Sequence, residues 1–328
     1  MQEKKKAILF EMMKGWAFGV LYVLRHCASA EERSMTVPVV SAVGSGPTGT
    51  IILFTHLRRC GGTFLEEALL KPHVKALGVK ALLCKEGELA RHHRLAPEQR
   101  SPYRAALREA SLVWRHCPYG VHSLLGRARP YAYVTMLRRP SERMVSWFAY
   151  CDRYSPDKCK TGKTFGGRGD KRVIVFYEAR QRKYHSLDHE RRKTSSTFHE
   201  DWLEFALDDN YAVRMICGAD AHDASVPLPD TALDCAKKHL RHHYAFVGTL
   251  ERRDESLCLL TKVLGIPNTK APSSEKLRGP TTHTQAAPAN FLTQFSAYLR
   301  LDDQLYELAD SLLEARLVNS GGCLSSHQ

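Results

Sequence analysis

The sequence lacks the motifs of several common protein classes. Its ten cysteines form no Cys-x-x-Cys pair and no zinc-finger spacing, so a structural zinc site is not expected. No run of aromatic residues alternates with basic ones, as it does on platforms that bind single-stranded nucleic acid. Acidic residues are also scarce: 35 aspartates and glutamates stand against 48 lysines and arginines, a formal net charge of +13. We therefore expect polyanionic partners such as phosphorylated cofactors or acidic glycans, and no nucleic acid.

The N-terminal region lacks an apolar run long enough to span a bilayer in the ordinary way. Lys4–Lys6 are followed by the uncharged, mostly apolar residues Gly15–Leu24 and by the small residues Ala28–Ala30. This order is typical of a signal peptide or a signal anchor, with an amphipathic helix as the alternative. We predict such a segment at residues 1–30, with possible membrane anchoring, and a linker or stem at residues 31–49.

The most informative stretch, residues 50–70, changes from a strand pattern to a helix pattern. Ile51–Phe54 form a short apolar run that is typical of a strand buried on both faces. From Thr63 onward, apolar residues recur at helical spacing. The loop between them ends in Gly61 and Gly62, which allow a tight turn and a close approach to a ligand. The N–H groups at a helix start favour a phosphate or sulfate there, and an ordinary strand–loop–helix joint is the alternative.

This loop lacks the Gly-Lys-Ser/Thr sequence that nucleotide triphosphatases use. Arginines and a threonine supply charge and a hydroxyl group instead, and arginine grips oxyanions with a fork of N–H donors. The predicted anion-binding residues are Arg58, Arg59, Cys60, Gly61, Gly62, Thr63 and Phe64.

A second predicted strand, Tyr131–Leu137, ends at an arginine and leads into a helix. Pro140 marks the helix entrance, and Ser146 lies two turns into the helix. Arg138 and Ser146 are expected to hold one phosphate together, through the guanidinium fork and the hydroxyl group. A structural ion-pair network through Glu142 is the alternative.

A third predicted strand, Leu112–Trp114, is followed closely by His116 and a Pro-Gly turn. Ligands in α/β folds bind outside the carboxyl ends of the strands. The histidine is a candidate general base, because its pKa is expected to lie near neutral pH. A histidine that caps the turn or packs in the core is the alternative.

Three motifs resemble those of Golgi-type carbohydrate sulfotransferases, in particular the heparan sulfate 2-O-sulfotransferase-like group. Residues 57–63 resemble the family's 5′-phosphosulfate loop, Ile-Pro-Lys-Thr-Ala-Gly-Thr, with Arg58 in place of proline and Arg59 in place of the catalytic lysine. Residues 137–146 resemble its 3′-phosphate motif, Leu-Arg-Asp-Pro-x-x-Arg-x-x-Ser, with arginine in place of aspartate. Residues 115–122 resemble Gly-His-Cys-Pro-Tyr-Gly-Ile-His, with arginine in place of the first glycine.

The resemblance implies a P-loop-NTPase-like α/β fold of three layers, in which helices flank a central parallel sheet. The sulfotransferase domain would span residues 50–318, followed by a tail at residues 319–328. The donor co-substrate would be 3′-phosphoadenosine 5′-phosphosulfate, and the acceptor an acidic glycan or glycoprotein, with no metal involved. The implied location is the Golgi lumen or membrane, or the cytoplasm if the N-terminal segment is not a signal.

The resemblance also assigns roles to single residues. The histidine of the family expected to act as base matches His116, and the catalytic lysine matches Arg59. Family segments near the acceptor site match His122, Asn210 and Arg214.

Two other function classes share parts of this pattern. A P-loop kinase would have the same strand–loop–helix and bind ATP with magnesium, although the loop lacks its lysine. A non-catalytic binding protein for polyanions or nucleotides would share the positive charge and tolerate the altered loop. Tight binding of adenosine 3′,5′-bisphosphate without magnesium supports only the sulfotransferase scaffold.

The cysteines leave the redox compartment open. Cys151 and Cys159 bracket a loop with a proline and are candidates for a local disulfide, with two free thiols as the alternative. Four others lie among apolar residues and are expected to pack in the core: Cys84, Cys217, Cys235 and Cys258.

Overall fold

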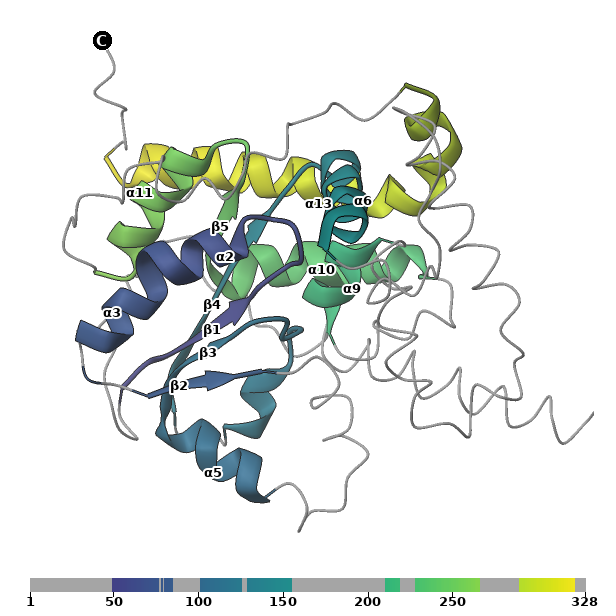
Figure 1. Ribbon diagram of the computed structural model, residues 1–328. Coiled ribbons are helices and arrows are strands. Elements are labelled where there is room, and N and C mark those ends of the chain that lie inside the picture. Colours follow the sequence, from purple (N-terminus) through teal and green to yellow (C-terminus); the bar gives the residue numbers. More distant parts are fainter. Residues whose placement is uncertain are drawn as a thin grey trace, which may run out of the picture.

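The fold is built on a parallel β-sheet with helices on both of its faces (Figure 1). The computed structural model describes residues 49–76, 78, 80–84, 101–125, 129–154, 210–218, 228–265 and 289–321. The strands of the sheet are β1 (Ile51–Thr55), β2 (Lys80–Leu83), β3 (Ala110–Trp114), β4 (Tyr131–Leu137) and β5 (Tyr244–Thr249). They are hydrogen-bonded in the order β2-β3-β1-β4-β5, and every pairing is parallel. The predicted α/β class with a central parallel sheet is confirmed.

Burial on both faces explains the continuous apolar runs of the strands. Every residue of β1 is buried. Ile51 and Leu53 belong to one core, whereas Ile52 and Phe54 belong to the other. Because successive side chains of a strand point to opposite faces, a strand between two helix layers needs apolar residues at every position.

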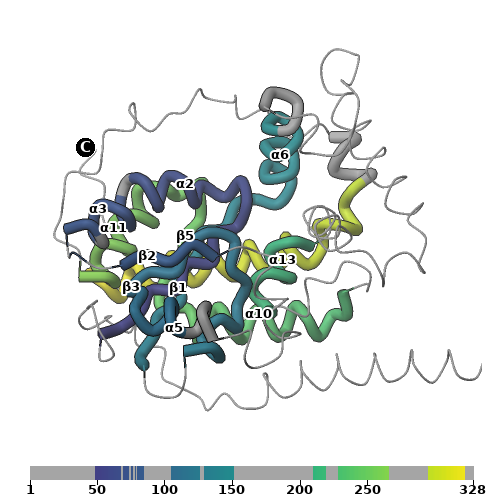
Figure 2. The backbone as a smooth tube through the Cα atoms, turned by 60° about the horizontal axis from the view of Figure 1, so that its bottom comes forward, coloured from purple at the N-terminus to yellow at the C-terminus, as the bar shows by residue number. Residues whose placement is uncertain are grey.

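Two helix layers cover the sheet, and Figure 2 shows α2 and α10 on opposite sides of the strands. One layer contains α2 (Gly62–Leu65), the π-helical turn η1 (Glu66–Leu70), α3 (Lys71–Ala76) and α11 (Arg253–Val263). The other contains α5 (Ser101–Glu109), the 3-10 turn η3 (Val121–Leu124), α6 (Pro140–Tyr154), α9 (Tyr211–Cys217) and α10 (Asp230–His242). The long α13 (Ala289–Asn319) packs into one core through Leu305 and into the other through Leu313.

The order of the strands reverses at β1. The chain leaves β1 to reach β2 and β3 on one side, and then crosses to β4 and β5 on the other. In open parallel sheets, ligands bind beside such a point, at the carboxyl ends of the strands. The segments that follow β1, β3 and β4 begin at this edge, and the three predicted motifs lie there: residues 57–63, 115–122 and 137–146, of which Leu137 is the last residue of β4.

Several predicted features lie outside the described residues. These are the targeting segment at 1–30, most of the linker at 31–49, the Cys151–Cys159 pairing and most of the tail at 319–328. Within the described ranges, no helix combines the length and apolar character needed to cross a membrane.

Cys84 packs in the core as predicted, but its disulfide bond was not expected. Cys84 forms a disulfide with Cys117 and so joins the end of β2 to the loop after β3, with a Cα–Cα distance of 5.7 Å. Cys258 is disulfide-bonded as well, whereas Cys217 and Cys235 are free and buried, as predicted. The pairing of distant cysteines cannot be deduced from the sequence alone.

Candidate functional site

The loop after β1 turns tightly at its two glycines, as predicted. Gly61 has a φ of 78°, in the left-handed region that favours glycine. At Gly62 an added Cβ would lie 1.9 Å from Cδ2 of His56, so the loop packs directly on this imidazole ring. Cys60 is buried, and burial raises the pKa of its thiol to about 12. Its side chain is therefore a neutral part of the core.

A hydrogen bond joins the two predicted phosphate motifs. Nε of Arg59 donates to Oγ of Ser146 at 3.0 Å, across 87 residues of sequence. The Arg59 guanidinium also lies over the Tyr150 ring, 5.1 Å from its centre. Arg59 has a φ of 65°, which is unfavourable for a residue with a side chain and is typical of functional loops that their surroundings hold in place.

Arg138 lies beside this contact, directly after β4. Its Nη1 donates to the carbonyl oxygen of Arg59 at 3.4 Å, and its Nη2 lies 3.6 Å from a carboxylate oxygen of Glu142. Its buried Nε has no hydrogen-bond partner among the described residues. The structural network through Glu142 therefore exists, but it does not satisfy the whole guanidinium, and a buried unsatisfied donor suits a bound anion.

The remaining residues of the predicted anion loop lie around this cluster. The guanidinium of Arg58 is 5.7 Å from the centre of the Trp147 ring, on the same helix as Ser146. Thr63 is exposed in the first turn of α2, and Phe64 is half-buried beside it. The structure thus brings the predicted loop residues and the β4–α6 motif to one place.

His116 is oriented by the backbone that follows β1. Its Nδ1 lies 2.8 Å from the carbonyl oxygen of His56. A carbonyl can only accept, so in the neutral ring Nδ1 carries the proton and Nε2 carries the lone pair. An isolated β-bridge between Thr55 and His116 also holds the segment after β3 against the end of β1.

The pKa of His116 lies well below its usual value of 6.5. Burial is the largest cause, followed by the neighbouring His56, Arg58 and Arg115. The near-neutral pKa expected from the sequence is therefore too high, because the sequence does not reveal burial or these neighbours. His116 is neutral at pH 7, and a general base needs this state.

His56 and Glu66 form a buried pair that sequence reasoning missed. Nδ1 of His56 lies 2.7 Å from Oε1 of Glu66, and both residues are less than a tenth exposed. The His56 ring stacks on Phe54, and its centre is 4.7 Å from that of the His116 ring. Glu66 belongs to the π-helical turn η1, a local feature that is frequent at functional sites. The pair therefore supports the segment whose carbonyl orients His116.

Replacing Glu66 by alanine should lower the free energy of unfolding by about 1–3 kcal/mol, because the buried His56 nitrogen loses its partner. Glu67→Ala is the matched control: the exposed pair between Glu67 and Lys71 is expected to contribute about 0–1 kcal/mol. Denaturant unfolding of both variants measures the difference. Equal losses in the two variants would show that the buried pair has no special stabilising role.

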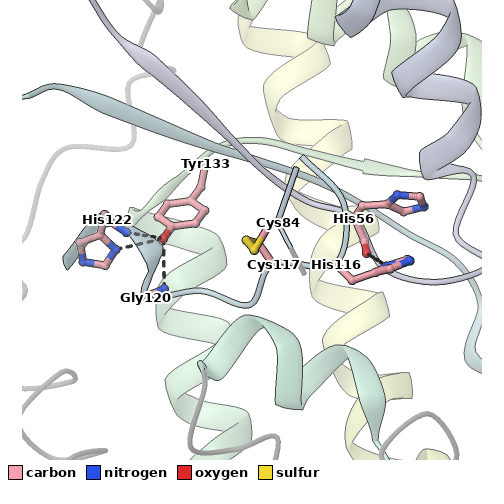
Figure 3. Close-up of a disulfide and its surroundings, with 7 residues drawn as sticks. All are labelled: His56, Cys84, His116, Cys117, Gly120, His122 and Tyr133. Atoms are coloured by element: carbon pink, nitrogen blue, oxygen red, sulfur yellow. Dashed lines mark hydrogen bonds between the residues drawn. A yellow bond between two sulfur atoms is a disulfide. The ribbon is translucent and has the colours of Figure 1, made fainter. Parts of the chain in front are cut away.

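The three predicted acceptor-binding residues have well-defined structural contacts, and their role toward an acceptor stays a prediction. His122 lies on η3, with Nδ1 3.0 Å from the hydroxyl oxygen of Tyr133. Figure 3 shows the Cys84–Cys117 disulfide between His122 and His116. The two histidines therefore lie on either side of this disulfide.

Asn210 and Arg214 have structural positions in the core. Oδ1 of Asn210 accepts hydrogen bonds from the backbone N–H groups of Leu301 and Asp302, at 2.9 and 3.2 Å. The Asp302 carboxylate accepts in turn from the first N–H groups of α9. Arg214 is fully buried. The contacts of Asn210 and Asp302 thus join α9 to α13.

The described residues show no metal-binding cluster, and comparisons with known proteins gave no match for the sequence. Among the residues that the structure describes, no three histidine, cysteine, aspartate or glutamate side chains are grouped closely enough to hold a metal ion. No protein-family model matches the chain, and no curated protein matches it either. The case for a function therefore rests on the site itself: an arginine-rich loop joined to the β4–α6 motif, beside an oriented, neutral histidine.

Proposed function

We propose that the protein is a sulfotransferase that moves a sulfuryl group from 3′-phosphoadenosine 5′-phosphosulfate to a hydroxyl group of a carbohydrate. The hydrogen bond between Arg59 and Ser146 carries this proposal. This bond places the two predicted anion-binding motifs, which are far apart in the sequence, next to each other. A donor that carries two separate phosphate groups needs two such motifs at one site. The resemblance of both motifs to those of Golgi-type sulfotransferases supports the same assignment.

The described residues fit such a donor. Arg58, Arg59 and the backbone of the Gly61–Thr63 turn would hold the phosphosulfate, and Arg138 with Ser146 would hold the 3′-phosphate. Nε of Arg138, which has no partner among the described residues, is a buried donor of the kind that an oxyanion satisfies. The tight glycine turn permits the close backbone approach that a phosphate needs.

The chemistry is an in-line displacement at sulfur. The acceptor hydroxyl oxygen forms a bond to sulfur while the bond from sulfur to the bridging phosphate oxygen breaks. Nε2 of His116 takes the hydroxyl proton, and adenosine 3′,5′-bisphosphate leaves. Arg59 stabilises the negative charge that develops on the bridging oxygen, and positioning of the two substrates supplies much of the remaining rate enhancement.

The acceptor proposed here is an acidic glycan or glycoprotein in the Golgi lumen. The net charge of +13 favours an anionic acceptor. Three disulfide-bonded cysteines, Cys84, Cys117 and Cys258, favour an oxidising compartment, because disulfides are rare in the cytosol. A transfer assay with radiolabelled sulfate donor and a panel of glycans tests the activity, and absence of transfer to every acceptor opposes it.

Donor binding is tested separately by titration calorimetry with adenosine 3′,5′-bisphosphate and a chelator of magnesium. Arg138→Ala should weaken binding by about 1.5–3 kcal/mol, as for a lost hydrogen bond to a charged group. Arg139→Ala is the matched control, because this neighbour is exposed and its guanidinium lies 3.9 Å from the Glu142 carboxylate. Unchanged affinity in folded Arg138→Ala removes Arg138 from the donor site. Binding of ATP that requires magnesium would instead support a kinase.

A further inference from the structure

The backbone at Arg115 adopts a conformation that favours glycine. Its φ is 81°, in the left-handed region. The turn is needed here, because the Arg115 carbonyl accepts from the N–H groups of His56 and Cys117, at 3.1 and 2.8 Å. These contacts bring His116 against the segment after β1. A glycine would adopt this turn without strain, yet the chain has an arginine, so its side chain is a candidate for a function that offsets the strain.

The Arg115 side chain lies at the edge of the candidate site. It is exposed, and its guanidinium is 5.5 Å from the centre of the Trp114 ring. Nζ of Lys71 lies 4.5 Å from the centre of the same ring. Lys71 has a carboxylate partner in Glu67, whereas no carboxylate among the described residues pairs with Arg115. Trp114 thus holds a cation whose N–H donors are accessible to a ligand.

The guanidinium also acts on the candidate base. Arg115 and Arg58 both contribute to the lowered pKa of His116, because their positive charges disfavour a protonated imidazole beside them. An acceptor hydroxyl group that reaches His116 therefore enters a positive field. A negative group close to that hydroxyl on the acceptor would lie within reach of Arg115.

We propose that Arg115, seated on Trp114, binds an oxyanion of the acceptor next to the hydroxyl group presented to His116, and so determines acceptor specificity. The oxyanion is a carboxylate or a sulfate carried by a sugar ring, since the guanidinium fork matches such groups. This inference rests on the proposed function, because the anionic sugar is an acceptor only if the protein transfers a sulfuryl group. The binding interaction itself needs no turnover and is measured without it.

The test compares wild type, Arg115→Gly and Arg115→Lys, with Arg241→Ala as the control for loss of one positive charge. Arg241 is exposed on α10, remote in sequence from all three motifs. Arg115→Gly suits the local φ, so loss of folding does not confuse the result. The probes are three size-matched hexasaccharides: one with uronic acid carboxylates and no sulfate, its carboxyl-reduced form, and one with sulfates and no carboxylates. Calorimetry at fixed salt, with adenosine 3′,5′-bisphosphate present, measures each dissociation constant.

Arg115→Gly should weaken binding of an anionic hexasaccharide about tenfold, as for one lost charge-assisted hydrogen bond, and leave the carboxyl-reduced form unaffected. A loss confined to the carboxylated probe assigns a carboxylate, and a loss confined to the sulfated probe assigns a sulfate. Arg115→Lys should be intermediate, because lysine keeps the charge without the fork.

Three results overturn the inference: no hexasaccharide binding by the wild type, unchanged binding by Arg115→Gly, or an equal loss in Arg241→Ala. The first two remove Arg115 from recognition, and the third reduces its effect to overall charge. Failure of the proposed function has a different signature. The bisphosphate would then not bind, or no sulfate would be transferred, while oligosaccharide binding still depended on Arg115.

Discussion

Replacing His116 by alanine should lower the rate of sulfuryl transfer by about 10²–10⁴-fold, the usual range for loss of a general base. The carbonyl of His56 holds the proton on Nδ1, so Nε2 is the basic nitrogen. Without it, the attacking hydroxyl group must lose its proton to water. Single-turnover transfer with saturating donor measures the effect on the chemical step directly.

The pH dependence of the rate is a second test of His116 as the general base. Only the neutral ring accepts a proton, so the rate should fall as the pH drops through the pKa of His116. Because burial and neighbouring cations hold that pKa well below 6.5, the rate should be flat around neutral pH and decline only in more acidic solution. His116→Ala should abolish this acid limb.

His122→Ala is the control for the pH experiment. His122 contacts Tyr133 and is separated from His116, so its loss should leave the acid limb in place. An acid limb centred at or above pH 6.5 in the wild type contradicts the environment found for His116. Full turnover of His116→Ala with an unchanged profile means that another group is the base.

The fold was predictable because buried parallel strands leave a strong local signal. Ile51–Phe54 and Tyr131–Leu137 are short, mostly apolar runs of the kind that a strand covered on both faces requires. Both form strands, and apart from Tyr131 at the start of β4 their residues are buried. The position of the anion loop was predictable for the same reason, since the glycine pair follows β1 directly. The motifs then meet because parallel strands end at one edge of the sheet.

Contacts between distant residues were not predictable. Nothing in the sequence marks Glu66 as a buried residue, yet its carboxylate is buried against His56. The segment around Asn210 resembles one near the family's acceptor site, and the structure adds that its side chain accepts from two N–H groups in the interior of α13. In both cases the residue type is compatible with either role, and only the packing of a second element decides between them.

Positive φ angles at Arg59 and Arg115 were equally hidden from sequence reasoning. Each residue was noted as a departure from the family's motif, at a lysine and at a glycine. The structure adds that both adopt a left-handed backbone, with φ of 65° and 81°. At Arg115 this gives a physical reason for the glycine in the resembling motif, because glycine alone adopts that φ without strain.

Replacing Arg59 by alanine should lower turnover by about two to three orders of magnitude, as for the loss of one donor that stabilises a developing oxyanion. The guanidinium stays protonated at every practical pH, so it acts as an electrostatic clamp and not as a proton donor. Its contribution should therefore not depend on pH, in contrast to that of His116. Rates of Arg59→Ala measured across the acid limb should run parallel to those of the wild type.

Arg59→Lys is the most informative variant at this position, since it restores the residue of the resembling family. It should keep the activity or raise it, because lysine preserves the positive charge beside Ser146. Arg139→Ala, an exposed arginine outside the donor cluster, is the control for loss of charge. Full turnover of Arg59→Ala removes this residue from the reaction. If neither the wild type nor the Arg59→Lys variant transfers sulfate to any acceptor while the bisphosphate still binds, the chain is a donor-binding protein without catalysis.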